Sequence, residues 1–190
     1  MRHYFFALLL LALFPLLHGC APLVVGGAVA GGAMVAQDRR TVGTMTEDEG
    51  IEQRASARVR ERFGESAYVS VTSYNRTVLL TGQAPDEKVR AEAERIARGV
   101  ENVRGVYNEL AIAGPSSFSA RSNDSIVTSK VKARFLDANK FNALHVKVVT
   151  ESGVVYLMGM VRKQEATDAT EIARTTSGVQ KVVRVFEYVD

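Results

Sequence analysis

The sequence predicts an α+β fold made of two tandem copies of one module, each running helix, strand, strand, helix, strand. Residues 69–82 and 146–159 repeat at an offset of 77 and share the pattern Val-x-Val, then Val-x-Leu-x-Gly. Farther along, Ile96–Arg98 and Ile172–Arg174 repeat the tripeptide Ile-Ala-Arg at an offset of 76. Self-similarity at a fixed period indicates a repeated structural unit. Within each copy the apolar spacing changes from four residues to two, as it does where a helix gives way to strands.

A helix opens each predicted module. Apolar residues recur there at every fourth position, which places them on one face of a helix. They are Ile51, Ala55 and Val59 in copy one, and Val127, Val131 and Phe135 in copy two. A β-hairpin follows in each copy, because apolar and polar residues alternate on both sides of a turn at residues 74–76 or 151–153.

A second helix and a last strand complete each copy. The helix carries the Ile-Ala-Arg tripeptide, and the strands are expected over residues 103–112 and 179–189. Gly114–Ser117 marks a linker. Two helices can cover one face of a three-stranded sheet. A module this small buries only about 60% of the surface of its unfolded chain, so we expect the two copies to pack on each other.

The N-terminal segment predicts export and lipid attachment. Arg2 and His3 precede an apolar run of about 14 residues, whereas a bilayer-spanning helix needs about 20. Leu17–Cys20 resembles the bacterial lipobox, and Cys20 is the only cysteine, so we expect it to be acylated rather than to form an intramolecular disulfide. The alternatives are an uncleaved signal anchor and an ordinary signal peptide followed by an unmodified cysteine. Ala21, by resemblance to lipoprotein sorting, favours the outer membrane.

These features divide the chain into five expected segments. They are a signal peptide (1–19), a lipidated apolar linker (20–46), module one (47–113), a linker (114–121) and module two (122–190). Residues 47–113 contain ten Lys/Arg and twelve Asp/Glu, a net charge of −2, whereas residues 121–190 contain eleven and eight, a net charge of +3. The basic second module favours an anionic partner.

The ordered motifs of both copies resemble the BON domain. They are Val-x-Leu-x-Gly at residues 78–82 and 155–159, an Ala-rich helix ending in Ile-Ala-Arg, and Val-x-x-Val. With the lipobox, they are similar to the dual-BON outer-membrane lipoproteins. The resemblance implies a non-enzymatic lipoprotein on the inner leaflet of the outer membrane, facing the periplasm. It also implies binding of anionic phospholipid such as phosphatidylglycerol, with a role in envelope integrity that extends to the division site.

Reactive side chains are scarce. Signal cleavage would leave His145 as the only histidine, and acylation would block Cys20, so Ser-His-Asp and Cys-His mechanisms lack components. Zinc would lack its usual ligands, and Gly26–Gly32 lacks the Lys-Ser/Thr of a phosphate-binding loop. We expect no enzyme activity, cofactor, metal or nucleic acid. Gly82 and Gly159 are expected to be structural, ending a strand beside a helix where no side chain fits.

The first helix of module two is the candidate lipid-binding site. Ile126, Lys130 and Arg134 lie one step around from the buried stripe, and Lys140 and Phe141 follow in the next loop. An apolar residue beside basic ones suits insertion among lipid headgroups. The alternative is a solvated basic helix face. Two other functions stay open: an adaptor for outer-membrane assembly or cell-wall remodelling proteins, and a hydrolase with paired carboxylates.

Overall fold

The computed structural model describes residues 38–114 and 116–190. The predicted signal peptide, the lipidation site Cys20 and most of the apolar linker lie outside these residues. The chain divides into two units, Met1–Asp38 and Arg39–Asp190, and the description below concerns the second. None of its described helices combines the length and the apolar character needed to cross a bilayer.

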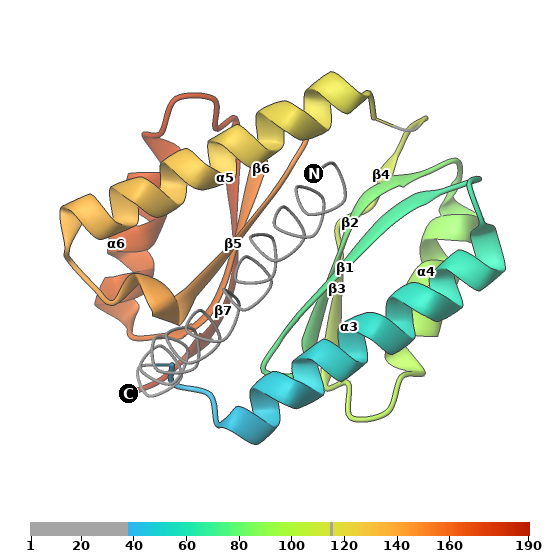
Figure 1. The fold of residues 1–190 in the computed structure, drawn as a ribbon, viewed down its shortest axis with the longest axis horizontal. Helices are drawn as coiled ribbons and strands as arrows, with labels where there is room; N and C mark the ends of the chain where they lie inside the picture. Colours follow the sequence, from blue (N-terminus) through green and yellow to red (C-terminus); the bar gives the residue numbers. More distant parts are fainter. Residues whose placement is uncertain (1–37, 115) are drawn as a thin grey trace, which may run out of the picture. The chain divides into compact units, whose positions relative to one another are not determined.

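Module one contains two α-helices and a twisted sheet (Figure 1). Its elements are α3 (Val42–Phe63), β1 (Tyr68–Tyr74), β2 (Thr77–Ala84), α4 (Glu87–Arg98), β3 (Gly105–Asn108) and β4 (Ala111–Ile112). The central strand β2 pairs antiparallel with β1 and parallel with β3 and β4. The last strand is split into β3 and β4. Between them Leu110 leaves the ladder and enters the core, and its backbone N–H donates a hydrogen bond to the Asn108 side chain.

Module two repeats this order. Its elements are α5 (Phe118–Ala138), the short 3₁₀ helix η2 (Ala143–His145), β5 (Val146–Glu151), β6 (Val154–Val161), α6 (Lys163–Arg174) and β7 (Lys181–Tyr188). The central strand β6 pairs antiparallel with β5 and parallel with β7. The predicted α+β architecture of two tandem modules is confirmed, with four α-helices among the described residues.

Both first helices begin earlier than the sequence pattern suggested. The Thr41 side chain accepts a hydrogen bond from the Thr44 backbone N–H at 3.1 Å, and Ser117 caps α5 in the same way through Ala120 at 3.2 Å. A hydroxyl at the N-cap satisfies one of the helix's unpaired N–H groups. Each helix therefore extends into residues that the apolar spacing had left to a linker.

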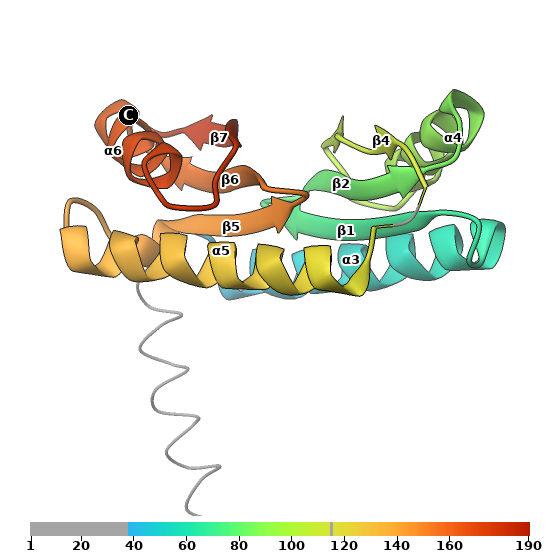
Figure 2. The same ribbon diagram turned by 90° about the horizontal axis from the view of Figure 1, so that it is seen from above.

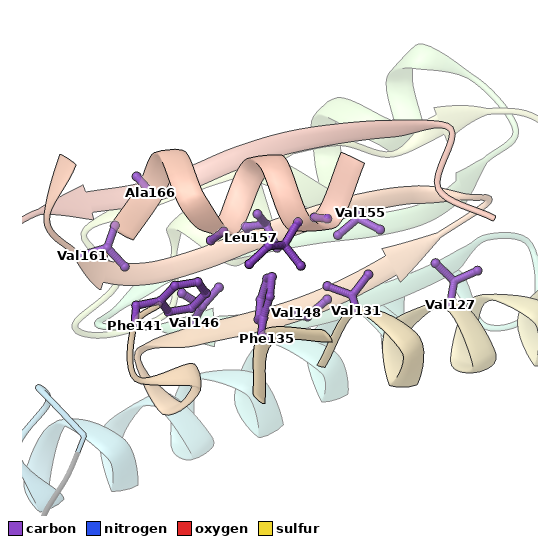
Figure 3. Close-up of a cluster of buried hydrophobic side chains, with 13 residues drawn as sticks. Val127, Val131, Phe135, Phe141, Val146, Val148, Val155, Leu157, Val161 and Ala166 are labelled. Carbon is purple, nitrogen blue, oxygen red and sulfur yellow. The ribbon is translucent and has the colours of Figure 1, made fainter. Parts of the chain in front are cut away.

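Each module has its own apolar core between its helices and one face of its sheet. Figure 3 shows the core of module two, where Val127, Val131 and Phe135 point from α5 toward Leu157 and its neighbours in the sheet. Module one uses the equivalent set, with Ile51 and Ala55 of α3 packed on Leu80 and its neighbours. The predicted four-residue stripe is therefore the buried face of each first helix.

The opposite faces of the two sheets pack on each other. Tyr74 and Leu79 of module one form a third buried cluster with Tyr156, Met158 and Val185 of module two. Burial raises the pKa of the Tyr156 hydroxyl to about 12. Figure 1 shows the helices on the outer faces of the sheets, and Figure 2 shows α3 and α5 along the same side. The expectation that the copies pack together is confirmed.

Candidate functional site

A buried aspartate fixes each first helix to the hairpin turn of its own sheet. Asp124 of α5 accepts hydrogen bonds from the backbone N–H groups of Ser152 and Gly153, both at 2.8 Å. Asp48 of α3 accepts equivalent bonds from Asn75 at 2.8 Å and Arg76 at 2.7 Å. These contacts set the rotation of each helix. The sequence carried a signal for them, because both aspartates lie three residues before the apolar stripe, at the 76-residue offset.

Two of the predicted lipid-binding residues lie open on the surface of α5. Ile126 is 53% exposed, and Lys130 is exposed one turn farther along. Arg134 instead turns toward α6, where Nη1 donates hydrogen bonds to the Ile172 carbonyl at 2.9 Å and to the Thr176 hydroxyl at 2.8 Å. Its guanidinium therefore ties the two helices together.

The two predicted loop residues are placed differently from each other. The Lys140 ammonium is exposed and lies 3.5 Å from the Asp168 carboxylate. Phe141 is only 9% exposed, and its ring packs edge-on against Phe135 with the ring centroids 5.1 Å apart. The short helix η2 follows it and returns the chain to the sheet. Phe141 therefore belongs to the core of module two, and the expected surface position is wrong.

Two exposed leucines were missed by the sequence analysis. Leu136 at the end of α5 is 67% exposed, and Leu144 in η2 is 38% exposed. They line an open pocket of about 340 Å³ that Lys132 borders. The signal for Leu136 was present, because it follows the last stripe residue and so falls outside the buried face. We define the α5 face as Ile126, Lys130, Lys132 and Leu136.

The α5 face combines apolar and basic groups in a way that module one does not. Asp137 is the only acidic residue from Ile126 to Ala138. At the 76-residue offset, α3 has Gly50 and Arg60 where α5 has the exposed Ile126 and Leu136. Its arginine at the position of Lys130, Arg54, is paired with Glu47 at 2.8 Å. At these two positions, exposed apolar side chains are thus present in α5 and absent from α3.

The two glycines of the repeated motif lie inside the central strands. A Cβ at Gly82 would lie 2.1 Å from the Tyr68 carbonyl oxygen, and one at Gly159 would lie 2.3 Å from that of His145. Gly82 also has a φ of +117°, a region that L side chains rarely adopt. The close neighbour is thus the carbonyl of the residue just before the glycine's partner in the adjacent strand, Val69 for Gly82 and Val146 for Gly159, rather than a helix as we expected.

The described residues show no other concentration of reactive groups. Among residues 38–114 and 116–190, no three His, Cys, Asp or Glu side chains are grouped so that they could hold a metal ion. His145 is largely buried, with its Nδ1 4.0 Å from a Glu165 oxygen. The α5 face is therefore the best candidate site in the part of the chain that the structure describes.

Comparison with known proteins identifies relatives of the whole chain. The BON domain family matches residues 48–114 and 123–190. The chain is 40% identical over 176 residues to outer membrane lipoprotein DolP of Haemophilus influenzae, covering 92% of this chain and 91% of that protein. It is 36% identical to a 21 kDa hemolysin of Actinobacillus pleuropneumoniae, covering 80% and 79%. It is 32% identical to osmotically-inducible protein Y of Escherichia coli, covering 80% and 77%. The resemblance drawn from the repeated motifs is confirmed.

Proposed function

Because this chain belongs to the BON domain family, we propose that it is an outer-membrane lipoprotein that binds anionic phospholipid through the α5 face. Acylation of Cys20 would anchor it on the periplasmic side. Its role would be to support envelope integrity rather than to catalyse a reaction. The name of the Haemophilus relative supports the location, and the composition of the α5 face supports the ligand.

One observation carries the proposal: two large apolar side chains stand exposed beside two lysines on a single helix. Ile126 and Leu136 are 53% and 67% exposed. An interfacial helix buries such side chains at the boundary between headgroups and acyl chains, while its lysines stay among anionic headgroups. The equivalent helix α3 offers arginine and glycine at the two apolar positions, so module two is the favoured membrane-binding half.

The binding free energies expected of these side chains suit a contact that supplements the lipid anchor. Full burial of a Leu or Ile side chain contributes roughly 1.5–3 kcal/mol, and a lysine near an anionic surface contributes about 1 kcal/mol. These amounts give weak, reversible binding on their own. A lipid anchor would hold the α5 face at high effective concentration beside the bilayer, so that a weak contact suffices to orient the modules.

Vesicle co-sedimentation of the chain without residues 1–20 tests the proposal. We expect binding to phosphatidylglycerol vesicles and little binding to phosphatidylcholine vesicles. Leu136→Asn should weaken the binding about tenfold, because about 1.4 kcal/mol corresponds to a factor of ten. Ile126→Ala combined with Lys130→Glu should weaken it further.

A matched control comes from the repeat itself. Arg60 occupies the position of Leu136 in α3, so Arg60→Asn removes a side chain at the equivalent site without touching the α5 face. Because Arg60 lies on α3 and not on the α5 face, this variant should leave phosphatidylglycerol binding within about twofold, or about 0.4 kcal/mol. If the Leu136 and Ile126/Lys130 variants bind as the wild type does, the α5 face is not the lipid site. Protein partners that survive those variants would then favour the adaptor function.

A further inference from the structure

The two halves of the module interface are not equivalent. Lys147 of β5 reaches across to α3, where its Nζ lies 2.8 Å from Glu52 Oε1 and 3.3 Å from the Ser73 carbonyl oxygen. By the repeat offsets of 77 and 76, the equivalent residues are Ser70 in β1 and Thr128 in α5. An ion pair of long side chains on one side therefore corresponds to two short hydroxyl side chains on the other.

A pocket of about 410 Å³ lies where the second ion pair would be. Ser70 and Thr128 both line it, and it is an open pocket bordered by β1, β2, α5 and β5. Seven of its eleven lining residues carry hydroxyl groups. Besides Ser70 and Thr128 they are Tyr68, Thr81, Ser125, Ser129 and Thr150. Short side chains at the equivalent positions thus leave a polar pocket on this side of the interface.

The charged groups around this pocket already have partners. Both Asp124 oxygens accept backbone hydrogen bonds from the hairpin turn. The Arg121 guanidinium lies over the Tyr68 ring, 5.2 Å from its centroid, and donates to the Ser116 carbonyl at 2.8 Å. Glu151 accepts a hydrogen bond from Gln83 Nε2 at 2.7 Å. The hydrogen-bonding atoms of these charged groups are therefore largely occupied within the protein, and the hydroxyl groups are the ones that face a ligand.

The hydroxyl groups that line the pocket differ in their remaining hydrogen-bonding capacity. Those of Ser125 and Ser129 donate to carbonyls of their own helix, and that of Thr128 donates to Thr150 Oγ1 at 2.7 Å. Hydroxyls both donate and accept hydrogen bonds, so even these retain accepting capacity. A cluster of this kind complements a ligand whose own groups also donate and accept.

We propose that this pocket binds the neighbouring hydroxyl groups of a small ligand. A saccharide unit and the glycerol of a lipid headgroup share that chemistry. The volume of about 410 Å³ lies within the range of roughly 300–1,000 Å³ that is usual for small-molecule sites. None of the four residues of the α5 face lines this pocket, so the proposal does not depend on the proposed membrane contact.

Ligand-observed saturation-transfer NMR on the full chain tests the proposal. The protein is held in dihexanoylphosphatidylcholine, whose headgroup has no hydroxyl, and is titrated separately with glucose and with dihexanoylphosphatidylglycerol. Saturation transfer to the glucose ring identifies a saccharide site. Transfer to the headgroup glycerol alone identifies a lipid headgroup site where the pocket variants below remove it, because the α5 face would bring this lipid to the protein in any case. Transfer to neither probe at millimolar concentration overturns the proposal.

A filled variant supplies the decisive comparison. Ser70→Lys combined with Thr128→Glu rebuilds the ion pair seen on the other side and occupies the pocket, so binding should disappear while the thermal midpoint is kept. A milder variant, Ser70→Ala with Thr81→Val, removes two hydroxyls at nearly constant volume and should weaken binding severalfold even if the filled variant fails to fold. Thr167→Val, on the exposed side of α6, is the matched control and should bind as the wild type. Persistence of binding in the milder or the filled variant contradicts the assignment.

Discussion

Replacing Asp124 with alanine should strongly destabilise the folded unit. Its carboxylate is 6% exposed and accepts two backbone hydrogen bonds, from Ser152 and Gly153, each at 2.8 Å. A hydrogen bond to a charged group contributes about 1.5–3 kcal/mol, and a buried N–H left without a partner costs about 1–3 kcal/mol. With two such N–H groups, we expect Asp124→Ala to lower the free energy of unfolding by about 3–5 kcal/mol.

Thermal unfolding followed by circular dichroism measures this loss. For a unit of this size, about 1 kcal/mol shifts Tm by about 2–4 °C, so Tm should fall by roughly 6–20 °C. Asp124→Asn keeps one acceptor oxygen and should fall between the wild type and the alanine variant. Asp137, exposed on the same helix, is the control, and Asp137→Ala should stay within about 0.5 kcal/mol. A loss below about 1 kcal/mol for Asp124→Ala would refute the view that this carboxylate holds α5 to its hairpin.

Three further predictions concern the sheets, the module interface and the N-terminal end of the described unit. Gly82→Ala, whose Cβ would meet a backbone oxygen at 2.1 Å, should lower Tm sharply, whereas Gly105→Ala, with no atom within 4 Å of its Cβ, should not; equal effects would contradict the close approach. Burial raises the pKa of Glu151, so the free energy of unfolding in urea should decline as the pH rises through that raised pKa. Glu151→Gln should abolish this decline. A Glu151→Gln variant with the same pH profile as the wild type would contradict the assignment of the decline to Glu151. The Arg39 guanidinium, bonded to Glu165 at 2.6 and 2.9 Å, lowers the pKa of that carboxyl. Arg39→Ala should therefore cost about 1–2 kcal/mol near neutral pH. The loss should become smaller as the pH falls through the lowered pKa, leaving only the part due to the hydrogen bond from Arg39 to the Met160 carbonyl. A loss that does not change with pH would contradict the role of the ion pair.

The sequence allowed the elements and their buried faces to be predicted, because burial imposes a period on each of them. Every member of the stripe Val127, Val131 and Phe135 is buried against the sheet, as the four-residue spacing indicates. The N-caps of α3 and α5 could also have been predicted, because threonine and serine, here Thr41 and Ser117, are favoured N-cap residues. The split of the last strand was not, because it depends on where Asn108 and Leu110 meet the rest of module one.

The candidate site was predictable only in part, for a physical reason. Periodicity shows which way a side chain leaves the helix axis, and it placed Ile126 and Lys130 correctly on the surface. It does not show what lies beyond the side chain's tip. Arg134 contacts the end of α6, which is far away in the sequence. Phe141 contacts Phe135 from a loop, where no periodic pattern indicates which side chains are buried.

The face-to-face packing of the two sheets bears on how a chain of this kind can originate. A single ancestral copy would have left the surface now formed by Tyr156, Met158 and Val185 in water, and a self-complementary patch of that kind favours a symmetric homodimer. Fusion of two copies makes such a partnership intramolecular and independent of protein concentration. It also releases each half from identity with the other. The two sides of the interface could then diverge. One side now has the lysine–glutamate ion pair, and the other has the pocket lined by hydroxyl groups.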